Sequence, residues 1–434
     1  MIDLISYAGS YLLLAFKKFK INIYIMQKIW IIWWWASWIM SAASLILNWY
    51  DWEISIFEKN NKLGTKVMIS GGGRCNLTTW IRNKKEFLSK YPRGEKFVKY
   101  YYWKFWPKKV FERFESQWIN LKIENDMRVF PKSNSSKDVL NIFHKLFEKN
   151  NVKVHYQSRV ESIQKQNDIF KVKTQDNVYE FDKIILTTGG NAYSHTWSSG
   201  DGYDFAKSFW HKITKLWPSL NSFKTKQDFS SISWLSFQDW YLVYKWKKVY
   251  WPVLFTHFGI SWPATFALSS YSSLEEVSEN NPLRIQFVPE KKYDYEFLEK
   301  YLIDASESSP KKLLKNILYS LYPNKFVDLF LKNNWIDKEL KLCYMPKDQR
   351  KLISKTLGMW MDIDLIMRRP GDEFVTAWWV DLEGINKESL ESKLVSNLYF
   401  AGEILDVDGF TWGFNLRWCW ASAYILAKKI ALDK

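Results

Sequence analysis

One stretch near the N-terminus, from Lys28 to Asn76, constrains the fold more than any other part of the chain. An apolar run that ends at Ile32 is followed by a helical pattern and by a second short apolar run, Ile54 to Phe57, which closes with the acid Glu58. Two buried strands joined by a helix, with an acid after the second strand, form the outline of a βαβ unit. The sequence therefore predicts an α/β domain built on a parallel sheet.

The turn between the first strand and the helix departs from the pattern of βαβ units that bind dinucleotides. Glycines in a G-x-G-x-x-G fingerprint allow the tight turn, the approach of backbone N–H groups to a pyrophosphate, and the packing of helix on strand. An indole blocks all three, yet the chain has Trp33, Trp34, Trp35, Ala36, Ser37 and Trp38. Either the outline is a coincidence, or the printed tryptophans are not the residues that the cell uses.

Composition favours the second alternative. The chain has 26 Trp and only 17 Gly in 434 residues, about 4% glycine where about 7% is usual. The simplest hypothesis is a gene in which UGA encodes glycine, translated with a table in which UGA encodes tryptophan. Some glycines are printed as such, because GGGRCN, from Gly71 to Asn76, is intact.

Length, charge and cysteine content set only broad limits on function. A chain of 434 residues suits two or three domains. The formal charge of +16 comes from lysines spread along the chain, so a nucleic-acid partner is allowed but not expected. Cys75, Cys343 and Cys419 form no C-x-x-C pair, which favours the reducing cytoplasm over a disulfide framework.

Two segments raise the question of a membrane. Residues 1–25 mix apolar residues with lysines and lack a signal-peptide cleavage pattern, so we interpret them as an extension or a mis-assigned start ahead of Met26. The stretch Ile29 to Tyr50 has no charge and is long enough to span a bilayer. Small residues dilute it and a strand ending in an acid follows, so we expect no membrane span.

The middle of the chain alternates between segments of different character. We expect helices in residues 84–114, a short strand pair near 121 and 129, a helix from Ser136 to Lys149, a parallel strand at 152–156 and a β-meander at 159–181. A buried strand, residues 183–187, then runs into Thr188, Gly189 and Gly190, with a helix from near Asp204. Residues 215–270 read as all-β, 293–340 as helical, and 351–369 as a return to β structure.

The C-terminal motif is a second example of a buried strand that is followed by glycine. A buried strand, Leu398 to Ala401, ends in Gly402 and Glu403; a loop carries Asp406, and a helix starts near Asn415. The helix N-terminus suits an anionic or electron-rich group, and the acid suits the hydroxyls of a sugar or ribitol chain. Two glycine-ended strands and one fingerprint turn favour a dinucleotide held across one sheet edge.

With Trp replaced by Gly, several motifs resemble those of a known family. IIGGGASG, EKNNKLGTKVMISGGGRCNLT, TTGGNAYSHTGSSGDGY, GPVLFTHFGISGP and LYFAGEILDVDGFTGGFNL are similar to the FAD-binding oxidoreductases of the aminoacetone oxidase, or BaiN/YhiN-like, family, in order from about Met26 to Lys434. Ten tryptophans then fall on family glycines: Trp33, Trp34, Trp35, Trp38, Trp197, Trp251, Trp262, Trp378, Trp379 and Trp412.

The resemblance implies a glutathione-reductase-like, Rossmann-type FAD-binding domain, in residues 26–193 and 370–434. A β-barrel-like domain, 194–275 and 346–369, and a helical insertion, 276–345, would interrupt it. It also implies FAD contacts along the chain, from the following residues: Trp33, Trp34, Trp35, Ala36, Ser37, Trp38, Glu58, Lys59, Gly71, Gly72, Gly73, Arg74, Cys75, Asn76, Val160, Thr188, Gly189, Gly190, Gly402, Glu403, Asp406, Trp412, Gly413 and Asn415.

The resemblance implies an FAD-dependent oxidoreductase that acts on an unidentified small molecule by hydride transfer, with NAD(P)H a candidate reductant. The alternative is a flavin-dependent RNA-modifying protein. No metal is expected, and no catalytic residue stands out. Plain structural roles stay open for several residues: an ion pair for Arg74, a small buried side chain for Cys75, a structural role for His257, a loop contact for His195 and a helix cap for Asn415.

Overall fold

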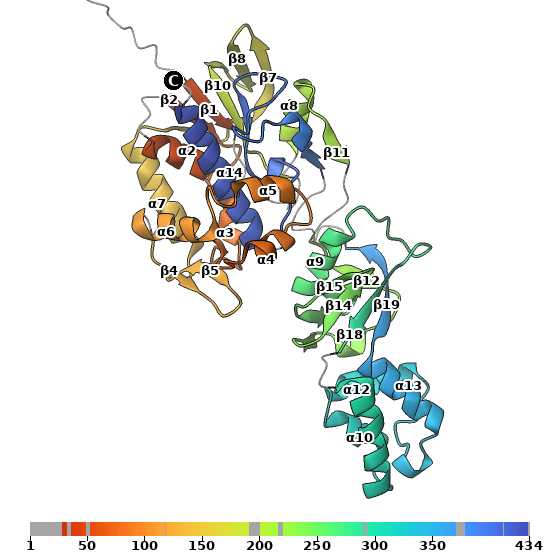
Figure 1. The fold of residues 1–434 in the computed structure, drawn as a ribbon. Helices are drawn as coiled ribbons and strands as arrows, with labels where there is room; N and C mark the ends of the chain where they lie inside the picture. The colour runs from red at the N-terminus through yellow and green to blue at the C-terminus, as the bar shows by residue number, and fades with distance from the viewer. Residues whose placement is uncertain are drawn as a thin grey trace, which may run out of the picture.

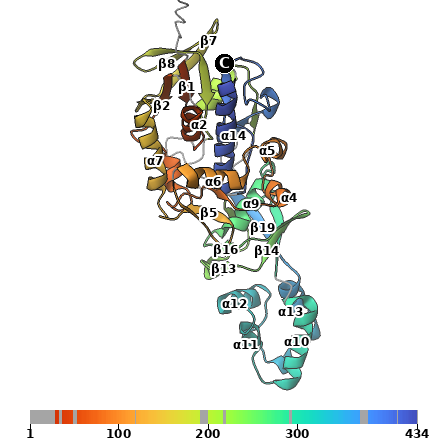
Figure 2. The same cartoon turned by 60° about the vertical axis from the view of Figure 1, so that its left-hand side comes forward.

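The computed structural model describes residues 28–32, 36–48, 53–117, 119–190, 200–215, 220–289, 293–369, 378–410 and 412–432. Three parts follow one another along an elongated molecule (Figures 1 and 2). A parallel sheet with its helices lies at one end, an antiparallel sheet lies in the middle, and a group of helices lies at the other end. The extension 1–25 and the turn residues Trp33, Trp34 and Trp35 fall outside the described residues.

The parallel sheet has five strands in the order β21-β10-β1-β2-β6, and every neighbouring pair is parallel. The predicted α/β fold with a parallel sheet is therefore confirmed. The strands β2, β10 and β21 are largely buried, as in a sheet covered on both faces, whereas the edge strand β6 is partly exposed. The bounds are β1 Lys28–Ile32, β2 Glu53–Phe57, β6 Lys153–His155, β10 Lys183–Leu186 and β21 Leu398–Phe400.

Helices and a small meander pack against this sheet. The helix α2 lies along α14 and contacts β1, while the meander contacts β1 and β10. The side chain of Ser135 accepts a hydrogen bond from the backbone N–H of Asp138 and so caps α7. The helices are α2 Ala36–Leu47, α3 Thr65–Ile69, α4 Lys84–Ser89, α5 Glu95–Tyr101, α6 Pro107–Gln117, α7 Ser136–Lys149, α8 Asp201–Ser208 and α14 Trp412–Leu432.

Three small sheets complete this part of the molecule. The predicted hairpin and meander are present in antiparallel pairings, and two further short strands pair near the middle of the molecule. The strands are β3 Thr78–Thr79, β4 Leu121–Ile123, β5 Arg128–Pro131, β7 Val160–Gln166, β8 Ile169–Thr174, β9 Val178–Phe181, β11 Ile213–Lys215 and β20 Trp378–Val380.

The middle part is an eight-stranded antiparallel sheet in the order β13-β16-β17-β12-β19-β18-β14-β15. The sequence predicted that residues 215–270 are all β, and this was wrong, because the helix α9 (Pro263–Tyr271) lies at their end. This helix begins with a proline, which is favoured in the first turn, and it buries small residues. The strands are β12 Phe223–Thr225, β13 Ser236–Phe237, β14 Tyr241–Tyr244, β15 Lys247–Val249, β16 Val253–Phe255, β17 Gly259–Ser261, β18 Leu283–Val288 and β19 Met361–Arg368.

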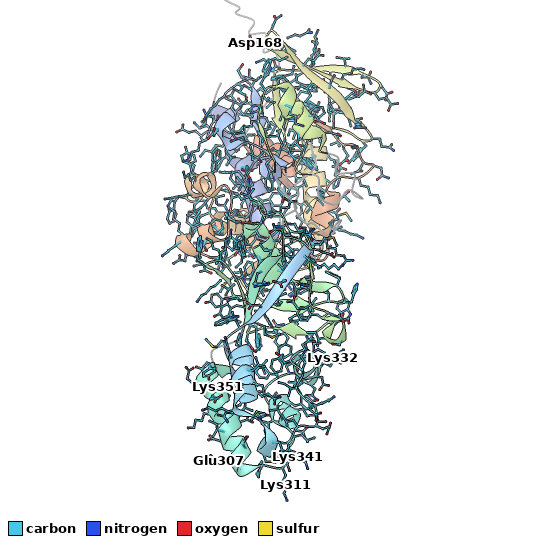
Figure 3. The ribbon with its side chains drawn as sticks, turned by 90° about the vertical axis from the view of Figure 1, so that its right-hand side faces the viewer. Asp168, Glu307, Lys311, Lys332, Lys341 and Lys351 are labelled. Atoms are coloured by element: carbon cyan, nitrogen blue, oxygen red, sulfur yellow. The ribbon has the colours of Figure 1, made fainter. Side chains whose placement is uncertain are left out.

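Helices form the far end of the molecule, where Figure 3 labels Glu307, Lys311 and Lys341 opposite the meander turn at Asp168. The return to β structure was predicted from Lys351, but the helix α13 occupies that position. Its apolar residues Ile353 and Leu357 lie on one face and are buried. The helices are α10 Tyr295–Ser308, α11 Leu314–Tyr319, α12 Asn324–Asn333 and α13 Lys347–Gly358.

Two hydrophobic cores hold these parts together. One surrounds the parallel sheet, and the other joins the antiparallel sheet to the far helices. Phe410, which follows β21 along the chain, belongs to the second core and packs on Trp251 and Tyr271. Among the described residues, no helix has both the length and the apolar character needed to cross a bilayer.

Candidate functional site

Four neighbouring strands of the parallel sheet end at one edge. The segments that leave them are the start of α2 after β1, Glu58 after β2, Thr188 to Gly190 after β10, and Gly402 with Glu403 after β21. Strand order reverses between β1 and β10, and ligands of open α/β sheets bind outside the carboxyl ends at such a switch point. The structure thus places these predicted residues at one edge.

Glu58 is a buried carboxyl group at this edge. The backbone N–H of Asn60 donates a hydrogen bond to its Oε1, whereas its Oε2 is buried and has no hydrogen-bond partner among the described residues. Burial raises the pKa of Glu58 to about 10, because the charged form loses its hydration. The backbone N–H of Ser158 donates a hydrogen bond to the Glu58 carbonyl (2.8 Å). This bond brings Val160, a predicted cofactor contact, to the same end of β2. Lys59 forms an ion pair with Asp201 at 3.4 Å.

The end of β21 fits closely against the start of α2. Gly402 has φ +79, and a Cβ at this position would lie 1.8 Å from Ser37 Oγ, so only glycine is accommodated. The next residue, Glu403, is buried, and no described residue forms a hydrogen bond with its Oε1. Burial raises the pKa of Glu403 well above its usual range, while Lys66 lowers it.

The glycine-rich segment 71–76 follows α3. Gly71 has φ +59, and a Cβ there would lie 2.9 Å from the backbone nitrogen of Asn76. Arg74 forms an ion pair with Glu124 at 2.7 Å, which is the structural role left open for it, and its guanidinium group lies over the ring of Phe130. The Cys75 thiol is buried, and burial raises its pKa to about 12, so it is a protonated core group rather than a reactive thiolate.

The loop and helix after β21 are fixed by their own contacts. Asn415 accepts from the N–H of Gly409 (2.7 Å) and donates to its carbonyl (3.0 Å), so its amide holds the loop closed. Both carboxylate oxygens of Asp406 accept hydrogen bonds from Arg93 at 2.8 Å. A Cβ on Gly413 would lie 2.9 Å from the side-chain amide of Asn76. Trp412 begins α14.

Several buried polar atoms at this edge have no hydrogen-bond partner among the residues that the structure describes. They belong to Glu58 (Oε2), Asn76 (Oδ1), Thr188 (Oγ1), Tyr203 (OH) and Glu403 (Oε1). Such atoms cost free energy unless a ligand or water bonds to them. Their chemistry, hydroxyl, amide and carboxyl, suits a ligand rich in hydroxyl groups and ring heteroatoms. The residues present therefore fit a dinucleotide such as FAD.

Sequence reasoning missed two buried titratable residues at this site. Lys66 lies in α3, and burial lowers its pKa to about 7, opposed by the charge of Glu403. Tyr203 lies in α8, and burial with Glu403 nearby raises its pKa. Neither stands in a recognisable motif, and the topology alone brings them to Glu403. His257 lies in the exposed turn between β16 and β17, and His195 lies outside the described residues.

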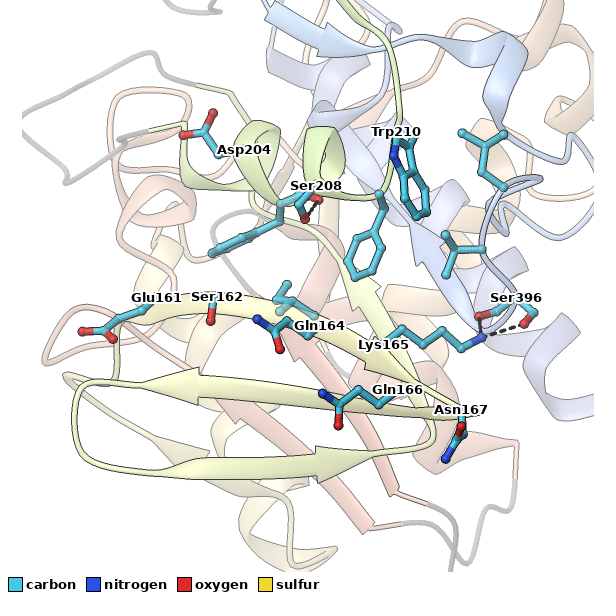
Figure 4. Close-up of a pocket in the computed structure, with 15 residues that line it drawn as sticks. Glu161, Ser162, Gln164, Lys165, Gln166, Asn167, Asp204, Ser208, Trp210 and Ser396 are labelled. Atoms are coloured by element: carbon cyan, nitrogen blue, oxygen red, sulfur yellow. Dashed lines mark hydrogen bonds between the residues drawn. The ribbon is translucent and has the colours of Figure 1, made fainter.

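A cavity of about 810 Å³ lies elsewhere, between β7, α8 and the loop at residues 394–396 (Figure 4). Its lining includes Gln164, Lys165, Asp204, Trp210 and Ser396, and none of the predicted cofactor residues. A cavity between the meander and α8 is not at the carboxyl ends of the parallel strands, where such a sheet binds its ligand. We therefore do not assign the cofactor to it.

The parallel sheet, its glycine-bearing strand ends and its buried acids define a Rossmann-type FAD-binding flavoenzyme. The model of the HI0933-like protein Rossmann domain family matches residues 27–429. The chain belongs to this family.

Two relatives and one solved structure illustrate its neighbourhood. A ribosomal RNA dihydrouridine synthase of Haemophilus influenzae is 27% identical over 395 residues, 87% of this chain and 92% of the relative. A 3-dehydro-bile acid delta(4,6)-reductase of Clostridium scindens is 25% identical over 418 residues, 94% of this chain and 99% of the relative. The 3-ketosteroid delta1-dehydrogenase of Sterolibacterium denitrificans has a similar fold, with a TM-score of 0.50, 11% identity, and coverage of 94% of this chain and 100% of that one.

Membership of this family, together with the bile acid reductase among its relatives, identifies this protein as an FAD-dependent oxidoreductase. FAD, when bound, supplies hydride chemistry, and the protein supplies binding, orientation and electrostatics. The described residues contain no cluster of His, Cys, Asp and Glu that would hold a metal ion.

Proposed function

We propose that this protein reduces a carbon–carbon double bond conjugated to a carbonyl group in a small molecule. Both curated relatives carry names for the saturation of a double bond, one in a uracil ring and one in a steroid. In such a reduction, the carbon β to the carbonyl gains a hydride and the α carbon gains a proton. The observation from the structure that supports the FAD site needed for this reaction is the group of buried polar atoms at the sheet edge that have no hydrogen-bond partner among the described residues.

In this proposal, different segments of the chain bind different parts of FAD. Glu58, next to Val160 and Lys59, would hold the adenosine ribose, and the first turn of α2, including Ala36 and Ser37, would face the pyrophosphate. The segment from Gly71 to Asn76 and the ends of β10 and β21 would lie along the flavin and ribitol. Trp412 and Gly413, at the start of α14, would lie at the flavin end. NAD(P)H is the candidate reductant.

The proposal includes glycine, encoded by UGA, at positions 33, 34, 35 and 38. The buried indole of Trp38 supports it, because its Nε1–H has no acceptor in the described part of the chain. A buried donor without a partner costs about 1–3 kcal/mol, and glycine at this position removes the donor. The three cysteines are free thiols, which fits the cytoplasm as the proposed compartment.

The test is a flavin reoxidation assay without oxygen. Protein made with glycine at the four positions is loaded with FAD, reduced with dithionite, and mixed with an α,β-unsaturated ketone such as a 4-en-3-one steroid or with the matched saturated ketone. We expect the unsaturated ketone to restore the oxidised flavin spectrum and the saturated ketone to leave it unchanged. No reoxidation by unsaturated ketones or by uracil-containing substrates would contradict the proposal.

A second candidate substrate is a uracil base within RNA. It is favoured by the name of one relative and by a basic, aromatic region on α4 to α6. There Lys84 lies over the rings of Tyr102 and Trp103, Lys104 lies over Tyr100, and Trp103 is 61% exposed. Aromatic rings and cations together suit single-stranded nucleic acid. RNA binding that weakens steeply with salt would favour this candidate, and binding insensitive to salt would exclude it.

A further inference from the structure

Four tryptophans among the described residues adopt a backbone conformation that bulky residues rarely adopt. They are Trp210 (φ 62), Trp234 (φ 70), Trp262 (φ 80) and Trp335 (φ 56). A left-handed conformation costs an L-residue roughly 1–2 kcal/mol, and only glycine adopts it freely. Packing of the side chains does not offset that strain, because the four indoles are 78%, 80%, 51% and 94% exposed, respectively.

Two of these tryptophans end helices in the same way. Trp210 follows α8: its N–H donates to Lys207 O (2.9 Å), and the next N–H, of His211, donates to Ala206 O (3.0 Å). These two bonds define the Schellman motif, whose left-handed residue is usually glycine and sometimes asparagine.

Trp335 repeats the motif after α12. Its N–H donates to Lys332 O (3.2 Å), and that of Ile336 donates to Leu331 O (2.9 Å). The end of α7 has the same pair of bonds, with Asn151 at φ 53 as the left-handed residue. Asparagine is an accepted occupant of this position, whereas tryptophan is not.

The other two tryptophans occupy turns with equally strict requirements. Ser233 has φ −53 and ψ 137, Trp234 follows at φ 70, and Leu235 N–H donates to Ile232 O (3.0 Å). This is a type II turn, which requires glycine or asparagine at its third residue. Trp262 has φ 80 and ψ 178, a region that is essentially restricted to glycine.

Other tryptophans show the opposite pattern. Trp240 does not have a positive φ. It is buried, with its ring 4.4 Å from that of Phe287, 5.0 Å from Phe237 and 5.6 Å from Phe326. An indole there contributes to the core as an aromatic residue does. The structure therefore separates positions that need an indole from positions that exclude one.

We infer that positions 210, 234, 262 and 335 are glycine in the protein that the cell makes. Each stands on its own turn geometry, independent of FAD, and positions 210, 234 and 335 lie outside the family motifs that suggested recoding at the cofactor turn. One cause accounts for them all: a codon, UGA, that the cell translates as glycine. Tryptophan remains at position 240.

The direct test is peptide mass spectrometry on the protein from its source cells. We expect peptides that cover positions 210, 234, 262 and 335 to carry glycine and the peptide with position 240 to carry tryptophan. An indole at any of the four positions, or glycine at 240, would overturn the inference.

The physical test uses a matched set of variants in a background with glycine at the cofactor turn. Trp210→Gly, Trp234→Gly and Trp335→Gly should each raise the folding equilibrium constant about 5- to 30-fold in urea unfolding. Trp335→Ala should gain less than Trp335→Gly, because alanine also resists φ > 0. Trp103→Gly and Trp246→Gly are controls, since both indoles are exposed at positions without a positive φ. Equal gains in the controls, or no gain at the three sites, would contradict the inference.

Discussion

Replacing Glu58 by glutamine should separate the stability of the FAD-free protein from its affinity for FAD. Burial raises the pKa of Glu58 from 4.5 to about 10, so between these values the folded state binds more protons than the unfolded state. Stability that is fully present below pH 4.5 is therefore lost as pH rises toward 10. At pH 7 the difference is about 2.5 pKa units, or roughly 3 kcal/mol at most.

Glu58→Gln removes this titration and keeps an acceptor for the N–H of Asn60. FAD-free Glu58→Gln should therefore be more stable than the parent protein by up to about 3 kcal/mol at pH 7, with the gain vanishing near pH 4.5. The same change removes one carboxyl oxygen from the acceptors proposed for the ribose hydroxyls. The carboxyl group is neutral at pH 7 with this pKa, and a neutral hydrogen bond contributes about 0.5–1.5 kcal/mol, so FAD should bind roughly 2- to 10-fold more weakly.

The assay is urea unfolding of FAD-free protein across about pH 5 to 9, followed by FAD titration at pH 7. Glu53→Gln is the matched control at the opposite end of β2, where Glu53 pairs with the exposed Lys153 at 2.8 Å. It should change stability by no more than about 1 kcal/mol and leave FAD binding intact. An unchanged pH slope in Glu58→Gln would refute the buried-carboxyl argument, and unchanged FAD affinity would refute the ribose assignment.

Three further predictions concern the same edge of the sheet. Gly402→Ala should destabilise the protein more than Gly72→Ala in thermal unfolding: both have positive φ, but only Gly402 would bring a Cβ into contact with α2, and equal losses would exclude the contact. Lys66→Met should abolish a rise in stability between pH 7 and 10.5, because burial lowers the pKa of Lys66 to about 7 and the unfolded state binds more protons in that window; a persisting rise would contradict this. Arg93→Ala should cost about 1.5–3 kcal/mol through the lost pair with Asp406, and a double-mutant cycle with Asp406→Ala should show coupling.

Sequence patterns predicted several strands of the parallel sheet because these strands are short apolar runs with a glycine or an acid soon after them. Lys183 to Leu186 and Leu398 to Phe400 are such runs, and both form strands beside β1. The helix α9 was missed because its proline and small residues resemble a turn in a β module. The start of α8 was predicted near Asp204 but lies at Asp201, directly after Gly200, which has a left-handed conformation.

The individual site residues were less predictable than the strands. Glycine motifs pointed to Gly402 and Gly71, whose positive φ values the structure shows. Lys66 and Tyr203 carry no local signal, because only the folded topology brings them to Glu403. Asp406 was predicted from the sequence to contact the cofactor. In the structure, both of its carboxylate oxygens accept hydrogen bonds from Arg93.

The most direct measurement for the central claim is the flavin content of two proteins that differ only at positions 33, 34, 35 and 38. Both genes carry glycine at positions 210, 234, 262 and 335; one has glycine and the other tryptophan at the four turn positions. The account predicts that the glycine protein is purified yellow, with close to one FAD per chain, and that the tryptophan protein is colourless. Equal flavin content would contradict the role of glycine in this turn, and two folded, colourless proteins that take up no FAD would contradict the cofactor site itself.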